Sequence, residues 1–457
     1  MGIGSQGAVT RGTALILAVC LTLASLVAAC GSSSSSGGSS AGSTKKVDMA
    51  AALKKPANIT VWAWTPGTED AVKVFEKKYP NIHVNLQNVG QGPPHYRKLR
   101  TAIKAGKGLP DVAQMEFQYI PSYTITKNLL DLRPYLPSNF LSEFPEWIGK
   151  QINLNGAVYG IPWDSGPLAL IYRKDLLAKA GVKTPIVTWD DFAKAATQYH
   201  QKNPSSYLVD MPGAQTGQWL ALFWQNGARP FNGDPNNFKV DLTDPKIKQV
   251  TEYWDKLYKA GVIAHDPDFT DAWYQGFAKG KYAGWLSAAW GPIFLQTYTK
   301  SSKGEWRAQP LPVWNAGDKT SANWGGSTLA VLNTTKYPAA ATEFARFILT
   351  DPKLQQMWAY QRFLFPTLNS MLRNQAWLNK GYPFYGGQAV NKVYAQMANE
   401  VDKNWQWPPI FDYVSTQGDD IKGKSVDQSQ SATAALQPWQ NAVVTYAKQQ
   451  GLKVAGQ

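Results

Sequence analysis

The chain of 457 residues holds only two cysteines, and both lie within its first 30 residues. A protein body that follows them has no thiols for an internal disulfide, so burial of apolar surface must hold the fold together. Histidine is also scarce. The four histidines are scattered, and none has a partner at the spacing of metal ligands, so the sequence gives no basis for a metal site.

Long runs of one charge are missing too. The formal net charge is +14, yet no five like charges follow one another, which argues against nucleic acid as a partner. We expect neither ATP hydrolysis nor serine-hydrolase chemistry, and no cofactor is implied. What the chain has in excess is aromatic residues, with 19 Trp, 21 Tyr and 17 Phe.

The first 29 residues have the order of a secretory signal peptide. Arg11 is the only charge before residue 45, an apolar run follows it, and small Ala28 and Ala29 precede Cys30. Val27 to Cys30 resembles a bacterial lipobox, which implies that Cys30 is lipidated and becomes the first residue of the mature protein on the outer face of the cell membrane. The alternative is an uncleaved transmembrane helix, because the run is nearly long enough to span a bilayer.

Residues 30–50 are predicted to be a lipidated cysteine followed by a flexible linker, because residues 31–44 are only Gly, Ser, Ala and Thr.

The remaining chain is too long for one core and predicts two domains. Its first part alternates strand and helix patterns, with strands at 59–64, 82–86 and 111–116. Such alternation predicts a parallel doubly wound sheet, whose ligands bind beyond the carboxyl ends of the strands. Trp64 and Glu116 stand at two of these ends.

A second pattern covers residues 158–175, where a strand with Gly-Ile-Pro, a polar crossing and a second apolar strand lead into a helix capped by Asp175. With residues 226–228, 277–283 and 324–331, it resembles the family 1 extracellular solute-binding proteins, the sugar-binding receptors of ABC importers. The resemblance spans about residues 55–450. It implies an α/β, two-lobed fold of the periplasmic-binding-protein type II, each lobe a doubly wound sheet, with the ligand cleft between the lobes.

The resemblance also implies the division of the chain. Residues 55–164 with 328–385 form lobe 1, and residues 165–327 with 386–457 form lobe 2. The chain crosses near residues 163–166 and 324–328 and once more late in the sequence. Glycines at these crossings suit either hinges or plain turns. Pro438 departs from the family pattern, and we expect it to interrupt the last helix.

A sugar offers hydroxyls around its ring and C–H groups on its faces, so a receptor needs aromatic platforms and hydrogen-bonding side chains. Glu116 and Asp164 are the expected hydroxyl acceptors, with a helix cap or a surface charge as the alternative for each. Trp64, Trp290 and Trp324 are the favoured platforms because they follow strands and neighbour Pro or Gly, although a tryptophan in such a fold more often belongs to the core. The predicted ligand-binding residues are Trp64, Glu116, Trp163, Asp164, Trp219, Trp290, Trp324 and Gly325.

The resemblance implies a monomer that captures a sugar or oligosaccharide and delivers it to an ABC permease without breaking a bond. Two alternatives remain open. One is a receptor for another small polar solute, such as a polyol or a glycerol phosphodiester. The other is a secreted glycoside hydrolase that uses Glu116 and Asp164 as its pair of carboxyl groups.

The lipid anchor can be tested at Cys30. Cys30→Ser is expected to release or misprocess the protein without unfolding its body, because residues 31–44 have no side chains that could build a core. Mass spectrometry of the native protein should show a diacylglycerol-modified N-terminal cysteine. A mature protein that starts at another residue, or that keeps residues 1–29, would contradict the prediction.

Overall fold

The computed structural model describes residues 45–456. Cys30, the predicted signal peptide and the segment from residue 31 to 44 lie outside the described residues. Hydrogen bonds fix the start of the described chain at Lys46. Its ammonium donates to the carbonyls of Arg133 and Leu136 at 2.8 and 2.6 Å. The body therefore begins a few residues before the end of the predicted linker.

Three parallel strands form the first part of the sheet, as the alternation predicted. β1 (Ala57–Trp62) lies between β2 (Ile82–Gln87) and β3 (Val112–Glu116) and is parallel to both. The helices α2 (Thr68–Lys78) and α3 (Pro93–Ala105) make the two crossovers. Each helix has an amphipathic pattern that buries one face, which is why this region was predictable from periodicity.

Two long strands extend this sheet and are antiparallel to each other. β11 (Asn323–Val331) pairs with β3, and β6 (Ile161–Arg173) pairs with β11. The far part of β6 also pairs with β9 (Gly284–Ala288) and β10 (Trp306–Pro310), both antiparallel. The predicted polar break between two separate strands is wrong, because β6 runs through it as one strand.

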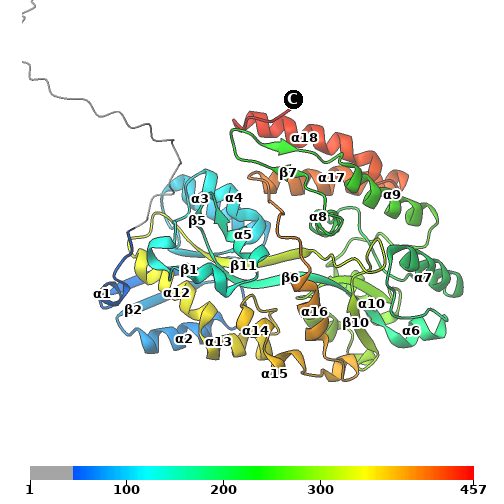
Figure 1. Ribbon diagram of the computed structural model, residues 1–457, viewed down its shortest axis with the longest axis horizontal. Helices are drawn as coiled ribbons and strands as arrows, with labels where there is room; N and C mark the ends of the chain where they lie inside the picture. Colours follow the sequence, from blue (N-terminus) through cyan, green and yellow to red (C-terminus); the bar gives the residue numbers. More distant parts are fainter. Residues whose placement is uncertain (1–44, 457) are drawn as a thin grey trace, which may run out of the picture. The chain divides into compact units, whose positions relative to one another are not determined.

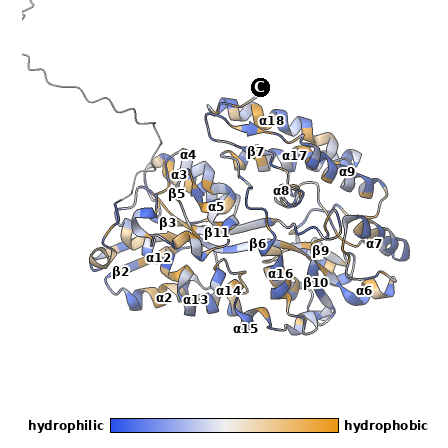
Figure 2. Cartoon of the chain, viewed as in Figure 1, coloured by the Kyte–Doolittle hydropathy of each residue, from blue (hydrophilic) through white to orange (hydrophobic). Residues whose placement is uncertain are grey.

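Helices cover both faces of this sheet (Figure 1). In this view α3, α4 (Ile120–Ile125) and α5 (Glu146–Ile152) lie above the first strands, whereas α2 and α12 (Pro338–Thr350) lie below them. Phe75 of α2 packs edge to face on Phe344 of α12, with ring centroids 5.1 Å apart. Hydrophilic residues are spread over the outer helices such as α7, α9 and α18, with hydrophobic residues interleaved (Figure 2).

The last part of the chain crosses the molecule once more. After α16 (Val390–Asn399), the segment 400–410 passes upward to α17 (Phe411–Ser429) in Figure 1, and α17 packs on α18 (Leu436–Gln449). The expectation that Pro438 interrupts the last helix is wrong. Pro438 lies in the first turn of α18, where a backbone N–H would have no acceptor within the helix, so proline, which lacks this N–H, is tolerated.

The remaining elements are short strands and peripheral helices. They are β4 (Asn153–Leu154), β5 (Ala157–Val158), α6 (Lys174–Lys179), α7 (Trp189–Lys202), α8 (Thr216–Gln225), β7 (Phe231–Asn232), β8 (Lys239–Val240), α9 (Pro245–Lys259), α10 (Asp271–Lys279), α11 (Pro292–Tyr298), α13 (Pro352–Gln356), α14 (Asn369–Leu372) and α15 (Gln375–Leu378), together with a short helix α1 (Met49–Ala52). Asp175 does not cap α6 as expected, because its carboxylate binds Arg173 in two bonds of 2.8 and 2.7 Å.

Much of the tryptophan excess serves this framework. Six indole N–H groups donate to main-chain carbonyls, and so satisfy backbone acceptors that would otherwise be buried without a partner. The donors are Trp147, Trp219, Trp224, Trp290, Trp358 and Trp439. Trp224 belongs to the buried core and lies on α8.

The described residues 45–456 form one unit by their contacts, and the division into two lobes remains a prediction. In the part of the chain that the structure describes, no helix is both long and apolar enough to cross a membrane.

The junction of β6 with β11 leaves no room for a side chain at Gly166. A Cβ at this position would lie 2.0 Å from the carbonyl oxygen of Trp324. Gly166→Ala is therefore expected to lower the free energy of unfolding by about 1–3 kcal/mol, through a shift of packed backbone. Gly149→Ala in α5 is the control, because its nearest new neighbour would be 3.8 Å away.

That control should raise the free energy of unfolding by about 0.5–1 kcal/mol, as alanine usually does in a helix. Urea titration of the parent and both variants compares them directly. Equal stability of Gly166→Ala and the parent would mean that the close approach at this junction does not exist.

Candidate functional site

Two carboxyl groups lie on either side of one serine in the middle of the sheet. Ser327 of β11 is in register with Glu116 of β3 on one side and with Asp164 of β6 on the other. Residues in register on neighbouring strands point to the same face of a sheet. The predicted acceptors Glu116 and Asp164 therefore share one face, two strand spacings apart.

Hydrogen bonds connect this row to the end of β1. Asp164 Oδ1 accepts from the Ser327 N–H at 2.9 Å and from its hydroxyl at 2.7 Å. The Gln114 side-chain amide donates to the same hydroxyl oxygen at 3.0 Å, and Gln114 Oε1 accepts from the main-chain N–H of Trp64 at 3.0 Å. Trp64, at a predicted strand end, thus belongs to the same polar network as Asp164.

Burial makes both carboxyl groups hard to ionise. It raises the pKa of Glu116 to about 8, and the negative charges of Asp164 and Asp412 push that pKa in the same direction. Burial also raises the pKa of Asp164, although the hydrogen bonds from Ser327 oppose the shift. Glu116 Oε2 is buried without a hydrogen-bond partner among the described residues. A buried, unpaired carboxyl oxygen costs stability unless a ligand supplies its partner.

Two predicted platforms meet beside this row. The Trp290 indole donates to the Trp324 carbonyl at 2.9 Å, and the two ring centroids are 5.0 Å apart. Gly325 follows Trp324 with a φ of 74°, in the left-handed region that favours glycine. At Gly217 in α8 a Cβ would lie 2.6 Å from the Trp324 indole nitrogen, so glycines fit closely around this ring.

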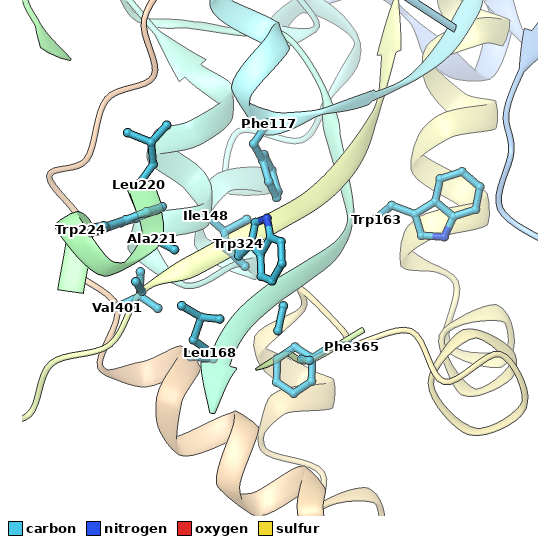
Figure 3. Packing of buried hydrophobic residues seen from close by; sticks show 14 of the residues in the cluster. Phe117, Ile148, Trp163, Leu168, Leu220, Ala221, Trp224, Trp324, Phe365 and Val401 are labelled. Carbon is cyan, nitrogen blue, oxygen red and sulfur yellow. The ribbon is translucent and has the colours of Figure 1, made fainter. Parts of the chain in front are cut away.

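The structure puts Trp163 and Trp219 elsewhere. Trp163 is 2% exposed and packs edge to face on Trp358, with centroids 5.2 Å apart. In Figure 3 Trp163 and Trp324 lie on opposite sides of β6. Trp219 is fully buried, and its indole donates to the Pro212 carbonyl at 3.0 Å. Both rings pack in the core. Glu116, Asp164, Trp290, Trp324 and Gly325 lie on or beside β3, β6 and β11, with Trp324 itself only 7% exposed, whereas the Trp64 ring packs on His95 with centroids 5.0 Å apart.

Several polar and aromatic residues of this region were not predicted from the sequence. Asp412, at the start of α17, pairs with Arg100 of α3 and is close enough to Glu116 to affect its pKa. Asp268 accepts from the Gln215 amide at 2.9 Å, and burial raises its pKa to about 6. Phe269 lies 6.0 Å from both Trp290 and Trp324. No local pattern marks these residues, because α10, α17 and their loops meet β11 only in the folded chain.

A cavity of about 630 Å³ lies between α4, α5 and the crossing segment, lined among others by Lys150, Arg229, Trp405 and Trp407. None of the predicted ligand-binding residues lines it. Volume alone therefore does not identify the site, and the chemistry of the carboxyl row and the paired indoles carries the assignment.

Two stretches match nucleotide-binding or hydrolase motifs by letter, although neither chemistry is expected. Gly418 to Ser425 fits the P-loop pattern, but these residues lie inside α17. A P-loop needs a loop between a strand and a helix, so that its free N–H groups can hold phosphate. Residues 38–42 fit G-x-S-x-G but lie outside the described residues. The match in α17 cannot form a phosphate-binding loop.

The raised pKa of Glu116 has a consequence for stability. Its pKa is about 8 in the folded protein and 4.5 in an unfolded chain, so between these values the folded state binds more protons. The Glu116 contribution to stability is then lost as the pH rises from 4.5 to 8. Glu116→Gln cannot ionise, so its free energy of unfolding relative to the parent should increase across this pH range.

Urea titrations of parent and variant between pH 5 and 9 measure this difference. Glu252→Gln, at an exposed position of α9, is the matched control and should show no such trend. A difference between Glu116→Gln and the parent that does not change with pH would contradict the assignment of Glu116 as a buried acid.

Comparisons with known proteins agree with this architecture. A family model of bacterial extracellular solute-binding proteins matches residues 70–383. The ABC transporter associated binding protein from B. animalis subsp. lactis Bl-04, solved in complex with beta-1,6-galactobiose, is 30% identical. It aligns with a TM-score of 0.77 over 88% of this chain and 100% of that protein.

Two relatives are similar over most of their length. The arabinooligosaccharide-binding protein of Bacillus subtilis (strain 168) is 27% identical over 349 residues, which cover 73% of this chain and 78% of the relative. The diacetylchitobiose binding protein of Streptomyces coelicolor is 26% identical over 334 residues, 72% of this chain and 76% of the relative. With a family model that matches more than half of its length, the chain belongs to the bacterial extracellular solute-binding proteins.

Proposed function

We propose that the protein captures a sugar or oligosaccharide in the region between β3, β6 and β11 and delivers it to an ABC permease. The observation that carries this proposal is the row Glu116, Ser327 and Asp164 beside the paired indoles of Trp290 and Trp324. Carboxyl groups that exchange hydrogen bonds with hydroxyls, next to flat apolar rings, match the two surfaces of a sugar.

The relatives support the same ligand class. Two of the proteins named above are binding proteins for arabinooligosaccharide and diacetylchitobiose, and the third was solved in complex with beta-1,6-galactobiose. All three ligands are carbohydrates of two or more units. Their descriptions are those of binding proteins, which favours capture over a glycoside hydrolase that would use Glu116 and Asp164. The same comparison makes a polyol or glycerol phosphodiester the weaker alternative.

Each predicted residue has a proposed role. Trp290 and Trp324 are stacking platforms, with Trp64 as a third ring, and Gly325 gives the ligand close access to the main chain. Glu116 and Asp164 hydrogen-bond the sugar hydroxyls. With its pKa raised to about 8 by burial, Glu116 can donate as well as accept, which suits hydroxyls that do both, whereas Asp164 already accepts two hydrogen bonds from Ser327. Asp412, which pairs with Arg100 and raises the pKa of Glu116, is a further polar group of the site.

The remaining parts of the proposal concern the whole protein. Cys30 is the lipidated N-terminus, which anchors the receptor to the outer face of the membrane, and the receptor acts as a monomer. The two predicted lobes close around the ligand, which stabilises one of two existing arrangements. The permease then recognises the closed form, and no bond of the sugar is broken.

A sugar screen followed by calorimetric titration tests the site. Trp290→Ala or Trp324→Ala should weaken binding of the best ligand roughly 10²- to 10³-fold, because stacking area and pocket shape are both lost. Asp164→Asn keeps the shape and should cost about 1–3 kcal/mol of binding free energy. Trp314→Ala, which removes a partly buried indole packed on Trp189, is the matched control and should bind like the parent.

Each variant must keep a native melting curve for this comparison. If Trp290→Ala and Trp324→Ala fold and bind as tightly as the parent, the platform assignment is wrong. Chromatography after long incubation should return the same sugar, whereas catalytic appearance of shorter products would favour the hydrolase.

A further inference from the structure

Large apolar side chains gather on the surface next to the paired indoles. Four that are well exposed among the described residues belong to this one region: Phe269 at 39%, Ile293 at 39%, Phe294 at 36% and Tyr298 at 39%. Three of them lie on α11, which directly follows Trp290. Exposed apolar residues that cluster in this way mark interaction sites, whereas single ones need no explanation.

The rings form a continuous series that leads away from the site. Trp290 lies 5.0 Å from Trp324 and 6.1 Å from Phe294, measured between ring centroids. Phe294 lies 6.0 Å from Tyr274 of α10 at an interplanar angle of 21°. Tyr274 in turn stacks on Tyr298 at 4.1 Å and 7°. Every step is within the range of direct aromatic contact.

The backbone of Phe269 is strained. Its φ is 55°, in the left-handed region that non-glycine residues rarely adopt, and its ring remains well exposed. Such strain persists where the surrounding structure fixes it and concentrates at functional sites. Here it holds the Phe269 ring 6.0 Å from both Trp290 and Trp324.

From these observations we infer that the site continues along α11 as an aromatic ladder, in which the exposed rings of Phe294 and Tyr298 follow Trp290 and the buried Tyr274, only 6% exposed, packs against both. The ladder binds the outer units of an oligosaccharide whose inner units occupy the carboxyl row. This inference rests on the proposed function and narrows it. The preferred ligand has at least three units, because a disaccharide at Trp324 would leave Phe294 and Tyr298 unused.

An oligosaccharide fits this surface better than a protein partner does. The ladder is continuous with the paired indoles, so one chain-like ligand can contact both. The well-exposed apolar side chains of this region are mainly rings, and only Ile293 is aliphatic. Flat rings accept the C–H faces of successive sugars with little dependence on side-chain detail.

Binding affinity as a function of ligand length tests the ladder. The probes are arabino-oligosaccharides, chitooligosaccharides and β-1,6-galacto-oligosaccharides of two to five units, titrated calorimetrically into the parent protein. In the series that binds, affinity should rise about threefold to tenfold for each added unit that gains a ring contact. Phe294→Ala and Tyr298→Ala should remove this rise and leave disaccharide affinity unchanged.

A second tyrosine stack provides the matched control. Tyr446 of α18 stacks on Tyr413 of α17 at 3.9 Å and 7°, nearly the geometry of the Tyr274 and Tyr298 pair. Tyr446→Ala removes one ring of this pair outside the ladder. It should keep both the disaccharide affinity and the dependence on length, so a general loss of stability is separated from a loss of ladder contacts.

Three other results would overturn the inference. If the parent binds a disaccharide as tightly as the longer sugars and the ladder variants match it, the ladder is wrong while sugar capture stands. If the variants bind every length like the parent but cells that produce them take up less sugar, the patch contacts the permease instead. If the parent binds none of the sugars, the proposed function fails, and the ladder fails with it.

Discussion

The pairing of β6 with β11 is the constraint on which the rest of the molecule depends. These two strands join the parallel strands β1, β2 and β3 to β9 and β10, so the whole sheet is continuous through them. Their register is irregular at Asn323 to Thr328. There the Gly166 N–H donates to the Asn323 side chain at 2.7 Å, and Asp164 binds Ser327. Bulges of this kind redirect side chains and are common beside binding sites.

The same junction explains why aromatic residues have two uses in this chain. Indoles such as Trp147 and Trp224 are buried and donate to main-chain carbonyls, which fixes elements far apart in sequence. Trp290 also donates to a carbonyl, but that carbonyl belongs to Trp324 at the junction, and its own ring is only partly buried. The hydrogen bond thus orients the Trp290 ring against Trp324, which is itself only 7% exposed. Neither composition nor burial alone separates the two uses.

The sequence was informative where structure is local. Helix and strand periodicity from residue 57 to 116 predicted three parallel strands and two crossovers, because each element there has one clear buried face. It failed at β6, whose polar residues at 164 and 165 suggested a break although they pair with β11 inside the sheet. In α17 the residues that fit a P-loop pattern by letter lie in a helix, so letters without a strand and a loop do not identify that motif.

Prediction of the site was limited for a related reason. Glu116 and Asp164 stand next to strand signals, so their common face followed from strand order once β11 lay between them. Asp412 and Phe269 carry no such signal. Asp412 comes near Glu116 only because the crossing at 400–410 returns the chain to the sheet, and Phe269 comes near Trp324 only because the loop before α10 takes a strained conformation. Contacts of this kind depend on tertiary packing that no window of sequence contains.

The energetics of the carboxyl row give the strongest reason to regard it as a binding site. An unpaired buried oxygen on Glu116 costs free energy that glutamine or an apolar residue would avoid, and it contributes nothing to the sheet. Stability alone therefore gives no reason for an acid here. A ligand hydroxyl that pairs with this oxygen removes the penalty only in the bound state, so the cost present in the free protein becomes part of the affinity. A structural carboxyl group, such as Asp175 with its two bonds to Arg173, already has its partners, so binding of a ligand would remove no such cost. The difference between these two acids lies in the absence or presence of a partner within the chain, and this is the difference expected between a group that binds a ligand and one that holds the fold.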